Sequence, residues 1–238
     1  MKAMSRHRLK SQEGSRKEAL NDGGLVDANR ARLAADRIFE QSLGLLTRSG
    51  GLSILPGSWT EGWRVSDQGK LALSSYGLPP ARRDGLMGVA ADFQESGELE
   101  SGADGVRFYA LGRYGSAKLV AVEDDGCILA VPERSEVHPG LKSRCPLGIP
   151  AISVNASIDL FVECAWRWYW IVPLLADEQK RVGEAEISAW RKGGIDGIPD
   201  PYVEYQELCG YILKKYQVID STIQGDSDFW SDVIVDLW

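Results

Sequence analysis

Histidine is scarce in this sequence, which contains two among 238 residues. His7 lies in a basic N-terminal stretch, and His138 immediately precedes Pro139-Gly140, a pair typical of turns. Most zinc sites and many general acid–base sites are built on histidine. The scarcity therefore argues against a zinc enzyme and against a catalytic histidine, and we expect no metal site.

Cysteines and the common catalytic motifs are equally sparse. Cys127, Cys145, Cys164 and Cys209 are far apart in the sequence and form no Cys-x-x-Cys pair, which is typical of reduced thiols in a cytoplasmic protein. The sequence has no Gly-x-Ser-x-Gly elbow, no phosphate-binding glycine loop and no dinucleotide-binding fingerprint. These absences predict no catalytic residues and no cofactor.

A long apolar run is also missing. The longest apolar passage, around residues 165–176, is interrupted by Arg167 and is too short to span a bilayer. The basic N-terminus is followed by Ser, Gln and Glu instead of an apolar stretch, so it does not resemble a secretory signal. We expect a cytoplasmic protein that has no membrane partner.

Charge is unevenly distributed along a chain whose formal net charge is −7. Residues 1–17 contain six Lys/Arg and one Glu, whereas residues 177–238 contain 13 Asp/Glu and six Lys/Arg. An acidic folded body repels nucleic acid and attracts a basic protein partner. Surplus acid also keeps many proteins soluble without any partner, so charge alone does not decide between these roles.

Composition divides the chain into a tail and one domain. Residues 1–24 have few apolar side chains, scattered charge and a Gly23-Gly24 end, and they are predicted to form a disordered basic tail. Residues 25–238 are predicted to form a single domain, with a core over 66–175 and a helical segment over 176–238.

The order of local patterns indicates the fold class. Helical spacing at 25–48 and 66–76 is followed by short apolar runs at 86–93, 106–111, 119–122, 128–131 and 152–154. Turn-forming clusters at 102–105, 112–115 and 124–126 separate these runs. Helix candidates then span 158–172, 178–192, 202–216 and 228–238, and Pro173 is expected to end the first of them. This order predicts an α+β fold: an antiparallel sheet of about five or six short strands packed with helices, and a helical C-terminal third.

Two groups of carboxylates are the first candidate surface for a basic partner. They are Glu95, Glu98 and Glu100, and the turn acids Glu123, Asp124 and Asp125. Two such acids could instead pair as general acid and base or hold a divalent cation. Their Gly- and Ser-containing surroundings are typical of solvated turns, so we interpret them as surface charge.

Four aromatic residues occupy five positions of one predicted helix: Trp166, Trp168, Tyr169 and Trp170. They cannot all face the same way. Trp168 belongs on the core face, four residues after Cys164, whereas the other three face either the C-terminal helices or a partner. Because Trp and Tyr are favoured at binding hot spots, we add Trp166, Tyr169 and Trp170 to the candidate binding surface.

Four segments, in order, carry a resemblance to a known family. They are 71–80 with its Gly77-Leu78-Pro79-Pro80 end, 111–115 with the hairpin after it, 154–161 with Val154-Asn155-Ala156-Ser157, and 228–234 with Phe229-Trp230. Together they resemble the SUKH superfamily, in particular its fourth subgroup. The resemblance covers roughly 66–175 and the C-terminal helix. The N-terminal segment and the stretches around 133–150 and 177–200 depart from it.

The resemblance implies an immunity protein of bacterial polymorphic toxin systems. Such a protein binds and blocks a cognate toxin domain, a nuclease or nucleotide deaminase, without catalysis. No catalytic residue and no toxin-contacting position is transferred by the resemblance. Two other functions stay open: a regulatory or scaffold interaction module of the same fold, and an enzyme that uses paired carboxylates. The identity of the toxin and the oligomeric state stay open too.

Overall fold

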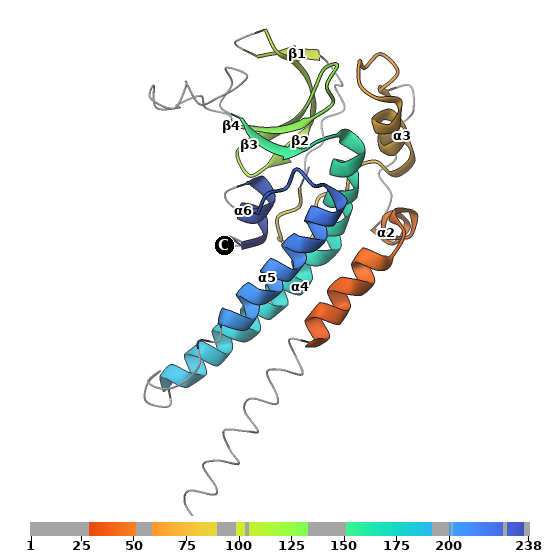
Figure 1. The fold of residues 1–238 in the computed structure, drawn as a ribbon. Coiled ribbons are helices and arrows are strands. Elements are labelled where there is room, and N and C mark those ends of the chain that lie inside the picture. The colour runs from red at the N-terminus through yellow and green to blue at the C-terminus, as the bar shows by residue number, and fades with distance from the viewer. Residues whose placement is uncertain are drawn as a thin grey trace, which may run out of the picture.

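A computed structural model gives the fold of the chain (Figure 1). It describes residues 29–50, 59–89, 99–102, 105–132, 151–191, 200, 202–225 and 228–235. Within these residues, helices come first, five strands follow, and helices form the C-terminal third. This order confirms the predicted α+β class. The predicted tail over 1–24 lies outside the described residues.

The five strands form one antiparallel meander in the order β1-β2-β3-β4-β5. Their bounds are Leu99–Ser101 for β1, Arg107–Tyr114 for β2, Ala117–Val122 for β3, Ile128–Pro132 for β4 and Ile152–Asn155 for β5. The predicted hairpin between β3 and β4 is confirmed. Asp124 and Gly126 adopt φ values of 67° and 78° in its turn, the left-handed region that Asp and Gly tolerate best.

Two predictions about the sheet are wrong in detail. Residues 86–89, the described part of the predicted strand 86–93, are not in a strand. The turn predicted at 112–115 begins only at Gly115, because Gly112, with a φ of 130°, continues β2. The register shifts between Ala110 and Gly112, so Leu111 is the extra residue of a bulge and Gly112 pairs with Leu119.

Both faces of the sheet are apolar. On one face, alternate residues such as Leu119, Ala121 and Ile128 join the main core. Phe108, Val120, Val122 and Leu129 form a separate cluster. Figure 1 shows α6, Phe229–Val235, and the first turns of α4 against one face. Burial on both faces explains why these strands appear in the sequence as short continuous apolar runs.

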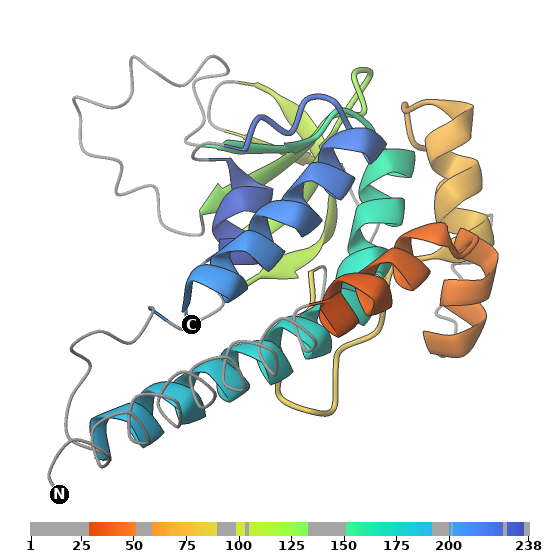
Figure 2. The same ribbon diagram turned by 60° about the horizontal axis from the view of Figure 1, so that its bottom comes forward.

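The longest element is α4, a helix of 34 residues over Ile158–Arg191 (Figure 2). Pro173 lies inside it, so the prediction that the helix ends at this proline is wrong. Proline has no N–H to donate to the carbonyl four residues earlier, which here belongs to Tyr169. The Arg82 guanidinium donates to that carbonyl and lies 4.6 Å from the centre of the Tyr169 ring. Arg82 therefore supplies the donor that Pro173 lacks.

This contact gives a first testable prediction. We expect Arg82→Ala to lower the free energy of unfolding by about 1–2 kcal/mol, since a partly buried carbonyl loses its donor. In a Pro173→Ala background the new N–H can bond to Tyr169, so the same substitution should cost less. Denaturant unfolding of the wild type, the two single variants and the double variant measures the coupling energy between Arg82 and Pro173. An equal cost in both backgrounds would contradict the pairing.

Four further helices of the described part of the chain pack against α4. The helix predicted over 25–48 is divided into one over residues 29–40, here called the 29–40 helix, and α2 over Leu43–Gly50. α3, Asp67–Tyr76, begins where the Ser66 hydroxyl accepts from the Gly69 N–H at 3.1 Å. It ends at Tyr76, as predicted, and Gly77 follows as the C-cap. α5, Tyr202–Ile219, runs along α4 in both views (Figures 1 and 2).

Candidate functional site

A buried polar network joins two of the segments that carry the family resemblance. Asn155, at the end of β5, is fully buried and its Nδ2 donates to Asp220 Oδ2 at 2.8 Å. Its Oδ1 accepts from Trp230 Nε1 of α6 at 3.1 Å. The Val154-Asn155 and Phe229-Trp230 segments therefore meet in the core, where their side chains hold β5 against α6.

Asp220 completes this network just after α5. Besides Asn155, it accepts from the Ala156 N–H at 2.9 Å and from the Thr222 N–H and hydroxyl at 3.0 and 2.6 Å. Burial acts to raise the pKa of Asp220, but the hydrogen bonds from Thr222, Ala156 and Asn155 outweigh it and the pKa lies below the usual value. Asp220 is thus an ionised structural joint between β5, α5 and α6.

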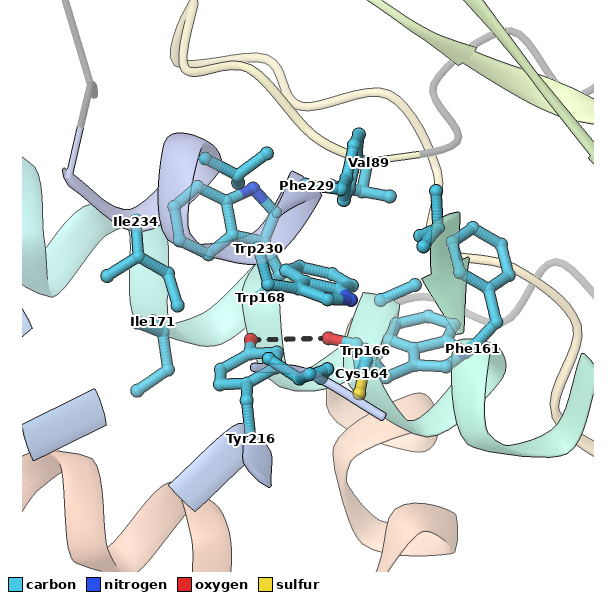
Figure 3. Packing of buried hydrophobic residues seen from close by; sticks show 14 of the residues in the cluster. Val89, Phe161, Cys164, Trp166, Trp168, Ile171, Tyr216, Phe229, Trp230 and Ile234 are labelled. Carbon is cyan, nitrogen blue, oxygen red and sulfur yellow. Dashed lines mark hydrogen bonds between the residues drawn. The ribbon is translucent and has the colours of Figure 1, made fainter. Parts of the chain in front are cut away.

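Other residues of the resembling segments also form core contacts. Gly77 C=O accepts from Trp166 Nε1 at 3.0 Å, and the Tyr114 ring packs edge-on against Phe229 at 5.4 Å. Figure 3 shows Trp168 and Trp230 near Tyr216, whose hydroxyl donates to the Cys164 carbonyl at 3.3 Å. These residues of the four segments therefore help to build the interior of the fold.

The acids of the hairpin turn are mostly paired with arginines. Glu123, whose side chain is 6% exposed, forms an ion pair with Arg107. Exposed Asp124 pairs with Arg64 at 2.8 Å, and this arginine also lies 4.0 Å from Glu123. Asp125 is exposed. The predicted acidic turn is therefore largely neutralised by arginines of the same chain.

The second group of acids, Glu95, Glu98 and Glu100, shows no free negative charge among its described members. Glu95 and Glu98 lie outside the described residues. Glu100 lies on the edge strand β1, where Lys118 Nζ approaches its Oε2 to 2.7 Å. The described member of this group is thus paired as well.

The three candidate aromatics of α4 differ in accessibility. Trp166 is fully buried, so we leave it out of any binding surface. Tyr169 is partly buried beneath Arg82, and partly buried Trp170 donates through Nε1 to the Leu46 carbonyl at 3.2 Å. These side chains pack toward α2 and the segment after α3, whereas the sequence left open whether they face the C-terminal helices or a partner. Tyr169 and Trp170 keep part of their surface open.

A groove that the sequence did not predict lies between the 29–40 helix, α4 and α5. Its volume is about 480 Å³, and it is lined by Phe39, Glu40, Glu163, Arg167, Lys215, Val218 and Ile219. Figure 1 shows the three helices side by side, and ion pairs such as Arg32–Glu207 at 3.0 Å link the first to the last. The lining residues come from distant parts of the sequence, so no local pattern indicates the groove. The 85% exposure of the apolar Val218 side chain marks this surface, but only the fold reveals it.

Reactive groups are sparse in the part of the chain that the structure describes. There, no three His, Cys, Asp or Glu side chains gather as a metal site would require. Cys127, Cys164 and Cys209 are free thiols. Burial raises the pKa of Cys127 and of Cys209 to about 11, so both stay protonated and weakly nucleophilic at neutral pH. None of the described helices combines the length and apolar composition needed to cross a membrane.

Comparison with known proteins gives one match, and it covers most of the chain. The family model of the SUKH-4 immunity protein matches residues 38–236. Searches of curated proteins and of solved structures gave no match. The matched stretch contains all four resembling segments and every residue that lines the groove. It also includes the stretches around 133–150 and 177–200 that departed from the resemblance.

Proposed function

This chain belongs to the SUKH-4 immunity protein family, and from that membership we propose that it binds and blocks a cognate bacterial toxin domain without catalysis. The family match over residues 38–236 is the observation that carries the proposal. In this proposal the toxin comes from the same strain, is a nuclease or nucleotide deaminase, and is neutralised in the cytoplasm.

The roles of the buried ionisable groups support a binding function. Asp220 is held by four hydrogen bonds, Glu123 by Arg107, and Arg167 by Glu163 and two backbone carbonyls. A catalytic acid or base needs access to substrate and a pKa near the working pH. These three groups have structural partners instead, so their arrangement fits a protein that acts by binding another protein.

The distribution of charge favours the helical side of the molecule as the surface for a basic toxin. The described residues between 151 and 235 include 12 Asp/Glu and six Lys/Arg, whereas those between 29 and 132 include nine Asp/Glu and 11 Lys/Arg. Negative potential speeds the association of a basic partner. We therefore propose contacts by α4 and α5, and keep Asp125, Tyr169 and Trp170 as further candidates.

Growth rescue and binding test this function together. The toxin domain encoded beside this gene should stop the growth of a host that lacks the chain, and coexpression of the chain should restore growth. The purified proteins should form a complex with a Kd below about 10 nM, and the association rate should fall as salt rises. Rescue without a complex, or growth unaffected by the toxin domain alone, would contradict the proposal.

A further inference from the structure

We propose that the groove between the 29–40 helix, α4 and α5 receives a lysine or arginine side chain of the toxin. The identity of the partner rests on the proposed function. The choice of a cationic side chain rests on which groups in the groove already have partners and which do not.

The first cation of the groove, Arg167, is held by the protein itself. Its guanidinium donates to the carbonyls of Ile38 and Gln41 at the end of the 29–40 helix, with Gln41 at 3.3 Å. Nη2 also lies 2.7 Å from Glu163 Oε1. These bonds satisfy carbonyls that the helix end leaves open, next to the negative end of the helix dipole. Arg167 is therefore not available to an anionic ligand.

The second cation, Lys215, is also occupied. Its Nζ lies 2.7 Å from Asp36 Oδ1 and 5.1 Å from the centre of the Tyr211 ring. The Tyr211 hydroxyl donates to the same Asp36 oxygen. The charge of Lys215 is thus neutralised within the chain. An anionic ligand would have to break the ion pair between Lys215 and Asp36.

Two carboxylates of the groove remain open. Glu163 accepts both Arg167 bonds through Oε1, at 3.1 and 2.7 Å. Within the described residues, its Oε2 and the exposed side chain of Glu40 take part in no hydrogen bond or ion pair. The groove thus offers acceptors and negative charge while its own donors are occupied, which favours a cation.

The apolar residues of the groove select the kind of cation. Phe39, Val218 and Ile219 lie among the same lining residues as the two carboxylates. Lysine and arginine pack their methylene stems on such surfaces while the charged group stays at the polar end. Arginine fits especially well, because its planar guanidinium can bond two carboxylate oxygens at once. A basic protein partner supplies such side chains.

Charge variants of the full chain test the groove with the purified toxin domain. Glu40→Gln combined with Glu163→Gln should weaken binding about tenfold, whereas Glu61→Gln combined with Asp67→Asn, at two exposed positions outside α4 and α5, should change it less than about twofold. Because Glu163→Gln affects the Arg167 bonds, Val218→Lys provides a second variant. It places a lysine of the chain at the groove and should weaken binding to a similar degree. Leu71→Lys, at an exposed position of α3 (64% exposed), is its control.

A second experiment separates the groove from the identity of the partner. In an NMR titration of the wild-type chain, butylguanidinium should shift the methyl signals of Val218 and Ile219, and butyrate should not. If the chain binds the toxin domain but the groove variants bind as tightly as their controls, the groove proposal fails while the proposed function stands. If the chain does not bind the toxin domain, the proposed function fails and the titration decides the groove chemistry. Equal shifts from both compounds, or none, would overturn it.

Discussion

Replacing Trp230 with alanine is expected to lower the free energy of unfolding by about 4 kcal/mol. The indole is fully buried in α6, with its ring 4.8 Å from Tyr216 and 6.4 Å from Trp168. Its Nε1 donates to Asn155. The substitution therefore removes a large apolar contact, leaves a cavity between α4, α5 and α6, and removes the donor from a buried amide oxygen.

Trp190 is the matched control for this experiment. It lies near the end of α4 with 64% of its surface exposed, so Trp190→Ala should change stability by no more than about 0.5 kcal/mol. Both chains are compared with the wild type by denaturant unfolding, with the slope m checked for changes in the unfolded state. A similar loss for the two tryptophans would show that the α6 contact does not hold the core together.

Asp220→Asn is expected to cost about 3 kcal/mol. Oδ2 accepts from Asn155 and Ala156, and Oδ1 accepts from both donors of Thr222. Asparagine replaces one of these oxygens with an NH2 group, which itself donates. In either orientation, two donors lose their acceptor and face another donor, so the substitution is severe although the side chain keeps its size.

The dependence of stability on pH distinguishes the contribution of the Asp220 charge from that of side-chain packing. The pKa of Asp220 lies below its usual value of 3.8 in the folded chain, so its carboxylate contributes stability that is fully present above about pH 4. That contribution is lost as the pH falls through the lower folded-state pKa. The difference in the free energy of unfolding between wild type and Asp220→Asn should therefore narrow in acid. A constant difference from pH 6 to pH 2 would contradict this role.

Local signals were sufficient for much of the fold. Ser66 and Gly77 mark the ends of α3, and Asp124 with Gly126 marks the hairpin between β3 and β4. Each acts through its own backbone, so the sequence alone reveals it. Pro173 shows the limit of such reasoning, because the helix continues where Arg82, 91 positions away, bonds to the carbonyl that the proline leaves open.

The binding surface was harder to predict for the same reason. The sequence identified Glu123 and Asp124 as acids, but their neutralisation depends on Arg64 and Arg107, which only the fold brings near. Trp166 has the composition of a binding anchor and is buried instead. The surplus of acid after residue 176 was visible in the sequence. The sequence nevertheless placed the candidate surface at the acids of 95–100 and 123–125 and at three aromatic residues of the long helix.

The segments that carry the family resemblance explain why fold and role are easier to assign than contacts. In the core, Trp230 donates to Asn155, and Asn155 donates to Asp220. The Gly77 carbonyl accepts from Trp166. The open groove acids, Glu40 and Glu163, lie outside those segments. A resemblance built on interior residues transfers the architecture, and the residues that meet a particular toxin must be found from the surface itself.

A titration of the toxin domain's enzymatic activity tests the central claim most directly. If the chain acts by occupying the toxin, activity should fall in proportion to the amount of chain added, reach zero near equimolar ratio, and return when the complex is denatured and the toxin alone is refolded. If a small fraction of an equivalent abolishes all activity over time, or the recovered toxin is chemically altered, the chain is a catalyst and the account is contradicted.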